Sequence, residues 1–238
     1  MKAGREYPAC MTEYEAFAVE LAREAEAAIR RLIAARYPGH GVIGEEYGED
    51  RPDAEHVWIL DPIDGTRAFI AGLPLWTNLI ALRSAGRPAV GVIGQPCLDE
   101  IFLGGPSGAR LLKGASETPL AVRACGHLND ALIATTDPNL FNGAELGAWT
   151  QVRAAARLAR LGCDAYAYAM VAAGRIDLVA ESALKVWDWS ALAPVIEAAG
   201  GQVTNWRGEA PDGSGQILAV GDARLADQAL VALRRAAA

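Results

Sequence analysis

Two carboxylates stand where a run of apolar residues ends, in the sequence Trp58-Ile-Leu-Asp-Pro-Ile-Asp-Gly-Thr66. Pro62 fixes its own φ and disfavours a helical conformation at Asp61, so we expect the strand to end in a turn. Both carboxylates and the Ile63 carbonyl would then face one side, and hard oxygen ligands of this kind suit Mg²⁺. An ordinary β-turn, in which Asp and Gly are common, explains the same residues equally well.

A covalent aspartyl nucleophile is the rival chemistry for this motif. Phosphatases that use one end a strand in two aspartates with one residue between them, whereas two residues separate Asp61 from Asp64. The motif also lies well inside the chain rather than at its beginning. The spacing therefore favours two ligands over a nucleophile beside its general acid.

Two more acidic residues become candidate ligands beside this motif. Glu45 lies in a Gly-Glu-Glu sequence shortly before the predicted strand, where a solvated loop is the simplest interpretation. Asp188 lies between Trp187 and Trp189 at the expected start of a helix, where capping is its default role. A carboxylate among bulky aromatic residues needs a partner if it is buried, and a cation would serve.

The first half of the chain is predicted to contain a helix and then mostly antiparallel strands. Apolar residues at helical spacing predict a helix over residues 13–37, which Pro38 and Gly39 end. A buried strand is expected at 56–61, and two apolar runs separated by turn residues predict a hairpin over 75–96. Short strands are expected at 99–105 and 108–112.

Strands alternate with helices after about residue 120, which is typical of an α/β layer. The strands are expected at 129–136, 157–162, 176–182 and 215–221. The helices are expected at 142–156, 164–174, 188–201 and 222–236. We therefore predict an N-terminal α+β subdomain over residues 1–120 and a C-terminal α/β subdomain over residues 121–238 that share one cleft.

Composition excludes several classes of partner. The 238 residues carry a net charge of −7, which disfavours binding to nucleic acid or to anionic membranes. Four scattered cysteines without a Cys-x-x-Cys pair disfavour a zinc site and predict reduced thiols in a cytoplasmic protein. We find no signal peptide and no run of roughly 20 apolar residues that would cross a membrane.

Taken together, these motifs resemble the inositol-monophosphatase family of Mg²⁺-dependent, lithium-sensitive phosphomonoesterases. Glu45, the Asp-Pro-Ile-Asp-Gly-Thr motif and the Trp-Asp pair before an Ala-rich helix occur in the family's order. The resemblance covers about residues 26–230 and implies a layered αβαβα sugar-phosphatase fold. It also implies hydrolysis by metal-activated water without a phosphoenzyme, and it allows a homodimer.

The resemblance assigns roles to individual residues. It implies two or three Mg²⁺ ions held by Glu45, Asp61, the Ile63 carbonyl, Asp64 and Asp188. Glu45 and Thr66 are the expected catalytic residues. The expected substrate-binding residues are Asp64, Gly65, Thr66, Arg67, Asp164 and Glu181, with the Gly65 and Thr66 amides facing the phosphate at the start of a short helix.

The substrate side is most similar to that of histidinol-phosphate phosphatases, which act in histidine biosynthesis. Arg67 and the sequences around Asp164 and Asp188 carry this similarity. L-Histidinol phosphate has an ammonium and an imidazole, so carboxylates such as Glu181 and Asp164 suit it. A strand-end charge and a helix cap are the simpler roles of these two residues, and inositol phosphate or another sugar or nucleotide monophosphate is the alternative substrate.

One family feature is absent. Family members usually carry a Val-Thr-x-x-Asp segment whose aspartate hydrogen-bonds the threonine of the motif and helps to activate water. In this chain the aspartate position falls at Ala22, and the leading helix that usually precedes this segment is also missing. Either Thr66 acts alone, or Glu20 or Glu24 replaces the aspartate, or the chain is a shortened, impaired form that binds metal and ligand better than it turns over.

Overall fold

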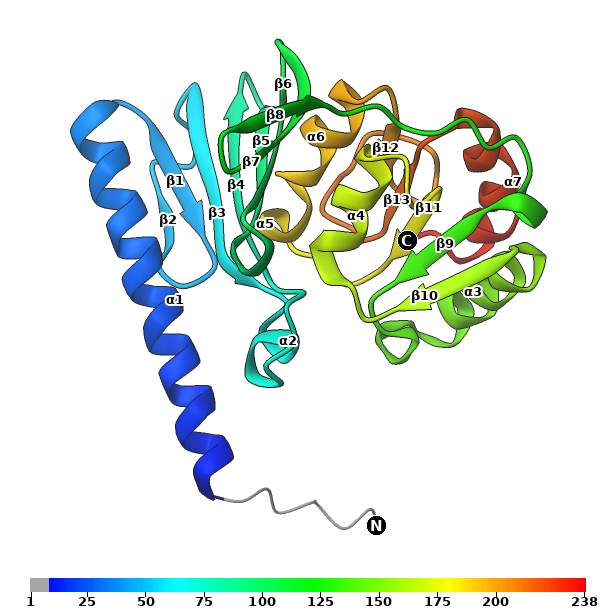
Figure 1. The fold of residues 1–238 in the computed structure, drawn as a ribbon, viewed down its shortest axis with the longest axis horizontal. Helices are drawn as coiled ribbons and strands as arrows, with labels where there is room; N and C mark the ends of the chain where they lie inside the picture. The colour runs from blue at the N-terminus through cyan, green and yellow to red at the C-terminus, as the bar shows by residue number, and fades with distance from the viewer. Residues whose placement is uncertain (1–8) are drawn as a thin grey trace.

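The computed structural model describes residues 9–238, with side chains from residue 20 onward. Its helices and sheets are stacked in layers (Figure 1). Helix α1 (Ala9–Arg36) lies on the outer face of one sheet, and a second sheet lies beyond a central layer of helices. The layered αβαβα fold expected from the sequence is confirmed.

Eight strands form the first sheet, here called sheet A, in the order β2-β1-β3-β4-β5-β6-β7-β8. Strands β1 and β3 are parallel, and the other neighbours are antiparallel. The strands are β1 (Gly41–Gly44), β2 (Gly48–Asp50), β3 (His56–Asp64), β4 (Thr77–Ser84), β5 (Arg87–Gln95), β6 (Glu100–Gly105), β7 (Gly108–Lys113) and β8 (Ser116–Pro119).

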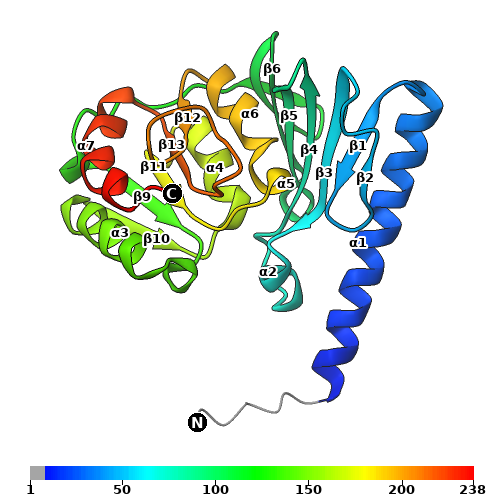
Figure 2. The same cartoon turned by 180° about the vertical axis from the view of Figure 1, so that it is seen from behind.

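The second sheet, sheet B, has the strand order β10-β9-β11-β13-β12. Its strands are β9 (Leu132–Thr135), β10 (Leu158–Leu161), β11 (Leu178–Glu181), β12 (Gln202–Thr204) and β13 (Ile217–Val220). The helices after α1 are α2 (Thr66–Ile70), α3 (Gly143–Ala155), α4 (Asp164–Ala172), α5 (Val186–Trp189), α6 (Leu192–Ala198) and α7 (Ala223–Leu233). Helices α3 and α7 cover the outer face of sheet B (Figure 2). Short 3-10 helices occur at Pro96–Leu98, Leu128–Asp130, Pro138–Leu140 and Arg234–Ala236.

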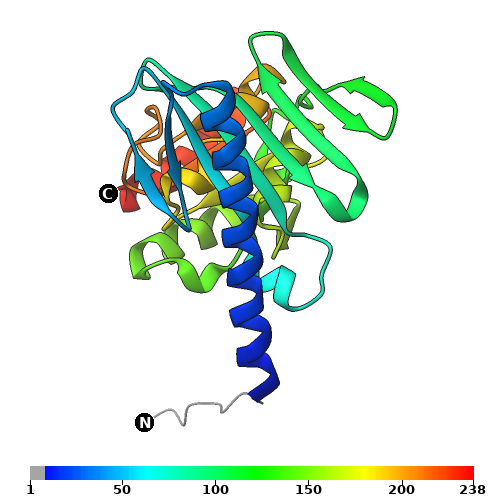
Figure 3. The same ribbon diagram turned by 90° about the vertical axis from the view of Figure 1, so that its left-hand side faces the viewer.

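Helix α1 runs across the outer face of sheet A, and its first turns extend past the sheet (Figure 3). From residue 20 onward its buried positions are Ala22, Glu26 and Ile33, whereas Leu32 is 72% exposed. Leu32 belongs to the apolar stripe on which the helix was predicted, so the stripe identifies the helix but not the face that packs. The packed face includes an acidic residue, Glu26.

A single helix was expected over residues 188–201, but the structure contains two, α5 and α6, with Ser190 and Ala191 between them. Pro194 explains the interruption, because it lacks the N–H that would donate to the carbonyl four residues earlier and its ring crowds that carbonyl. The four-residue α5 is thereby separated from the buried α6.

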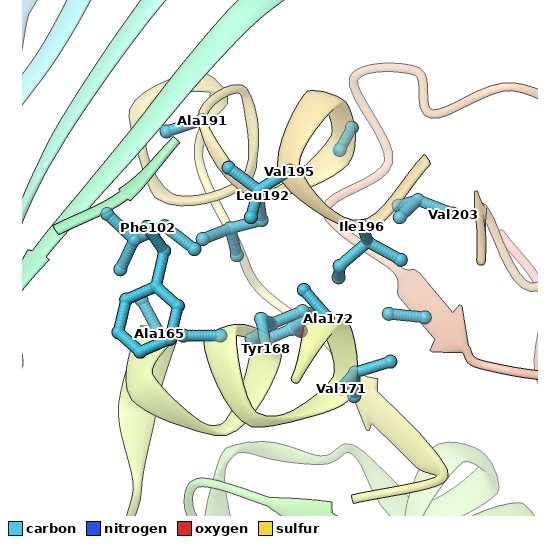
Figure 4. Packing of buried hydrophobic residues seen from close by; sticks show 14 of the residues in the cluster. Phe102, Ala165, Tyr168, Val171, Ala172, Ala191, Leu192, Val195, Ile196 and Val203 are labelled. Atoms are coloured by element: carbon cyan, nitrogen blue, oxygen red, sulfur yellow. The ribbon is translucent and has the colours of Figure 1, made fainter. Parts of the chain in front are cut away.

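The central layer packs closely against sheet A. Side chains of α4 and α6 interdigitate around Tyr168, Leu192 and Ile196 (Figure 4). A Cβ at Gly91 would lie 2.0 Å from the Ala191 carbonyl oxygen, so β5 needs a glycine where α6 begins. These helices therefore share one core with sheet A, even though they follow the predicted boundary near residue 120. No helix within residues 9–238 combines the length and hydrophobicity needed to cross a bilayer.

Candidate active site

The two aspartates of the central motif both belong to β3. The prediction of a turn at Pro62 is wrong. Strand β3 continues to Asp64, and its register with β4 shifts between Asp61 and Asp64. Pro62 has no N–H for the ladder, and the Asn78 side chain donates to the Pro62 carbonyl instead. An irregularity of this kind re-aims side chains, so Asp61 and Asp64 can face the same space.

Asp61 is a buried acid without a cationic neighbour in the described residues. Its side chain is 2% exposed, and Oδ1 accepts the Ile63 N–H at 3.1 Å. Burial, followed by the charges of Asp64 and Glu45, raises the pKa of Asp61 well above its ordinary value. The ionised form therefore needs a positive partner at neutral pH.

Asp64 connects sheet A to the central layer. Its Oδ2 accepts the Thr77 hydroxyl at 3.2 Å and the Ala165 N–H, at the start of α4, at 2.9 Å. Burial raises the pKa of Asp64 well above its ordinary value despite these hydrogen bonds. Asp164 was given helix capping as its simpler role, but it is the first residue of α4, and Asp64 receives the Ala165 amide.

Asp188 enters the same space from the central layer. It is the third residue of α5 rather than its N-cap, so the expected position is wrong, although its side chain still caps the helix through the backbone of the N-cap residue, Lys185. Its Oδ2 accepts the Lys185 N–H at 2.6 Å. Burial raises the pKa of Asp188 to about 6.

Carboxylate oxygens of Asp61, Asp64 and Asp188 all lie within 4.8 Å of one another. Burial raises the pKa of all three carboxyl groups, and neighbouring carboxylates raise the pKa values of Asp61 and Asp64 further, so three negative charges at this spacing are costly. A divalent cation with a preference for oxygen ligands would relieve that cost. The donor set therefore fits Mg²⁺, and these three aspartates would hold it.

Glu45 lies beside this group at the rim. It follows β1, which is parallel to β3, so the carboxyl ends of both strands reach the same edge of sheet A. The Glu45 N–H donates to the Leu60 carbonyl at 3.3 Å, and its side chain is exposed on the wall of the cavity that contains the three aspartates. Glu45 stands outside the group of carboxylate oxygens within 4.8 Å.

Thr66 and Gly65 complete the edge of the site. Gly65 has φ 78°, and a Cβ there would lie 3.2 Å from the Asp164 carboxylate, so glycine is required on both counts. The Thr66 hydroxyl donates to the Ile63 carbonyl at 3.2 Å. Glu20 and Glu24 are exposed on α1, and within the described residues neither forms a hydrogen bond with Thr66.

These residues line a cavity of about 190 Å³. Its wall carries carboxylates from both sheets and from the central helices, and within residues 20–238 it includes no Lys, Arg or His. The seven acidic lining residues are Glu45, Asp61, Asp64, Asp137, Asp164, Glu181 and Asp188. The wall of the cavity is thus acidic beyond the cluster of three aspartates.

Glu181 and Asp164 differ in how firmly they are held. Glu181 is buried at the end of β11, where it accepts the Thr136 N–H at 2.6 Å and the Tyr168 hydroxyl at 3.0 Å. Burial raises the pKa of Glu181 above its ordinary value. Asp164 has a left-handed backbone (φ 45°), and its carboxylate accepts no hydrogen bond from another described residue.

Asp137 is a lining residue that the sequence did not reveal. Its Oδ2 accepts the Arg67 guanidinium at 2.9 Å, which joins α2 to the segment after β9 across the cavity mouth. The Asn139 N–H lowers the pKa of Asp137, and Arg67 contributes to the shift. Asp137 precedes a proline just after an apolar run, as Asp61 does, and that pattern was the available signal.

We expect the metal-free protein to melt at a higher temperature at pH 5 than at pH 7.5. The folded protein raises the pKa values of Asp61, Asp64 and Asp188 above the ordinary 3.8, so it binds these protons more tightly than the unfolded chain. That stabilisation is complete at low pH and is lost as the pH rises through the folded-state pKa, about 6 for Asp188. Thermal unfolding in EDTA should show a difference of a few degrees, on the order of 1 kcal/mol.

The matched variant is Asp188→Asn, in which the difference should shrink. Saturating Mg²⁺ should remove it from the wild type, because the ion binds ionised carboxylates and stabilises most at the higher pH. A metal-free protein that is equally stable at both pH values would contradict the raised pKa values. Acids with a lowered pKa, such as Asp212 at about 2, titrate below this range.

Comparison with known proteins gives consistent results. The model of the inositol monophosphatase family matches residues 11–237. A bifunctional phosphatase, IMPL2, from Arabidopsis thaliana chloroplasts is 40% identical over 220 residues, which are 88% of this chain but 63% of that protein. A histidinol-phosphatase from Chlorobaculum parvum is 34% identical over 84% of this chain and 77% of its own length. The chain thus spans less than two thirds of the Arabidopsis relative.

A solved structure extends the similarity to the fold. The structure of an inositol monophosphatase from Zymomonas mobilis superposes with a TM-score of 0.85 at 35% sequence identity. The superposition covers 98% of this chain and 87% of that one. The relatives therefore include proteins named for either of two substrates.

Proposed function

Because this chain belongs to the inositol monophosphatase family, we propose that it is a Mg²⁺-dependent phosphatase that hydrolyses L-histidinol phosphate to L-histidinol and phosphate. The reaction is a step of histidine biosynthesis in organisms that make the amino acid. Membership of a phosphatase family supports a phosphoric monoester hydrolase, and the substrate is the finer part of the proposal.

The acidic lining of the cavity is the observation that supports histidinol phosphate as the substrate. Asp137, Asp164 and Glu181 add three carboxylates to the wall beyond the aspartate cluster and Glu45. L-Histidinol phosphate offers an ammonium and an imidazole to such a wall, whereas inositol phosphate offers hydroxyl groups. Ion pairing with a cationic substrate offsets the cost of keeping these carboxylates ionised in a cavity.

The residues of this chain divide the work of hydrolysis. Asp61, Asp64 and Asp188 would hold the cation at the cavity floor, with Glu45 at its rim. Bound Mg²⁺ would supply activation of a water molecule and neutralisation of the phosphate charge. The water oxygen bonds to phosphorus as the bond from phosphorus to the substrate oxygen breaks, and a proton from the water ends on the released alcohol. Thr66 would orient the water.

Inositol phosphate is the alternative substrate. The same aspartates would serve it, and the similarity to the Zymomonas mobilis inositol monophosphatase favours it. A second alternative is a protein that binds metal and ligand but turns over poorly, because Ala22 occupies the position at which the family resemblance implies an aspartate.

A substrate panel tests the proposal. We expect kcat/KM for histidinol phosphate to exceed that for inositol 1-phosphate and for a nucleotide monophosphate by about 100-fold, since unpaired buried charges reject substrates that cannot match them. Phosphate release at saturating Mg²⁺ gives the ratio. Equal rates on histidinol phosphate and inositol phosphate would remove the basis for the choice of substrate.

Asp164→Asn sharpens the same test. This change removes a carboxylate that has no hydrogen-bonding partner in the described residues, and we expect KM for histidinol phosphate to rise about tenfold. Inositol phosphate hydrolysis should change little. Asp227→Asn, an exposed substitution on α7, is the matched control.

A further inference from the structure

We propose that Glu26 is a positioning residue for Glu45. Its buried carboxylate holds residues 44–46 in the conformation that presents Glu45 to the metal site. The inference rests on the proposed metal site, and it adds a function for helix α1.

Glu26 is fully buried, with 0% exposure, on the face of α1 that packs against sheet A. A buried carboxylate is costly unless its charge and both oxygens have partners. Oε1 accepts the Arg30 Nε–H at 2.7 Å, which supplies the opposite charge. Oε2 accepts the Glu46 N–H at 2.9 Å, the amide directly after Glu45.

Gly44, the residue directly before Glu45, leaves the space that the Glu26 carboxylate occupies. A Cβ at Gly44 would lie 2.0 Å from Glu26 Oε1 and 2.4 Å from its Cδ. Gly44 is not among the residues with positive φ, so the requirement is for space and not for an unusual backbone conformation. Glu45 is therefore flanked on both sides by residues that contact Glu26.

Two neighbouring cations on α1 reinforce the contact. Arg30 also donates to the Gly48 carbonyl at 2.5 Å, at the far end of the same turn. Arg23 lies 3.4 Å from the Glu46 carboxylate, and this ion pair contributes little by itself because the Arg23 side chain is exposed to solvent. One face of α1 contacts residues 44–48. It carries Arg23, Glu26 and Arg30, which are spaced three and four residues apart.

The contact with Glu26 matters for the site because it fixes the backbone on both sides of Glu45. The Glu45 side chain is exposed at the rim, while its charge helps to raise the pKa of Asp61, which places the two carboxylates near each other. Supporting residues around metal ligands commonly change metal affinity 10- to 100-fold when altered. A residue that only anchored α1 to the sheet would change thermal stability without changing metal affinity.

The test compares Glu26→Gln with Glu24→Gln, an exposed control with the same change of charge on the same helix. Isothermal titration with Mg²⁺ in the absence of substrate should show an affinity weakened about 10- to 100-fold in Glu26→Gln and unchanged in Glu24→Gln. The Mg²⁺ concentration for half-maximal activity should rise in parallel, while KM for substrate at saturating Mg²⁺ stays constant.

Gly44→Ala is the second variant, since it displaces the Glu26 carboxylate without changing any charge, and it should reproduce the loss of Mg²⁺ affinity. If Glu26→Gln or Gly44→Ala binds Mg²⁺ as tightly as the wild type, the positioning role of Glu26 is wrong while the proposed function stands. A wild-type protein that does not bind Mg²⁺ would overturn the proposed function and, with it, this role.

Discussion

Asp64→Asn is expected to lower kcat/KM by about 1,000-fold at saturating Mg²⁺, on the order of 4 kcal/mol of transition-state stabilisation. The change removes one ligand charge at almost constant volume. The asparagine oxygen can still accept the Ala165 N–H that Asp64 accepts at 2.9 Å, so the link to α4 persists. In EDTA the variant should melt above the wild type, because it removes a buried acid with a raised pKa.

Opposite changes in activity and metal-free stability distinguish a ligand from a structural residue. Asp53→Asn is the control, since Asp53 is exposed between β2 and β3 and does not line the cavity. Phosphate release and thermal unfolding in EDTA are the two measurements. Wild-type activity in Asp64→Asn would show that the site has been assigned to the wrong residues.

Most elements could be predicted from local patterns, including the four-residue strands β9, β10, β11 and β13, but β1, β2, β8 and β12 could not. Strand β3 and the hairpin of β4 and β5 have long apolar runs that identify them. Strands β1 and β12 have four and three residues, too few to show a period. They form because β3 and β13 supply their hydrogen-bonding partners, and that pairing depends on the tertiary structure.

The shape of β3 shows a second limit of sequence reasoning. Pro62 was expected to end the strand, and the rule is sound for an isolated chain. In the sheet, the Asn78 side chain donates to the Pro62 carbonyl and the strand continues to Asp64 through an irregularity in its register. A side chain 16 residues away in sequence thus helps to hold the motif in the strand.

The candidate site could be assembled from motifs because its chemistry needs acids. Asp188 is far in sequence from Asp61 and Asp64, but all three have an unusual setting, and the structure brings their carboxylates together. Glu26 and Asp137 were missed because they contact residues that are distant in sequence, Glu46 and Arg67 respectively. Glu26 lies seven residues before Ile33, so helical spacing already placed an acid on the packed face of α1.

Ala22→Asp is expected to raise kcat by about 100-fold if turnover is limited by the lack of a general base. The family resemblance places an aspartate here that hydrogen-bonds the threonine of the motif. Ala22 is buried one turn before Glu26, and α1 contacts α2, which begins at Thr66. The Thr66 hydroxyl now donates to the Ile63 carbonyl, so it has no acceptor that could take its proton onward.

Initial rates and thermal unfolding of Ala22→Asp should be compared with those of Ala34→Asp, an exposed substitution on the same helix. Burying a new carboxylate should lower the melting temperature by a few degrees, whereas the exposed control should leave it nearly unchanged. A rise in kcat with an unchanged KM would place the effect in the transition state. An Ala22→Asp protein that folds and turns over no faster than the wild type would show that Thr66 acts here without that partner, and the impaired-enzyme hypothesis would then be wrong.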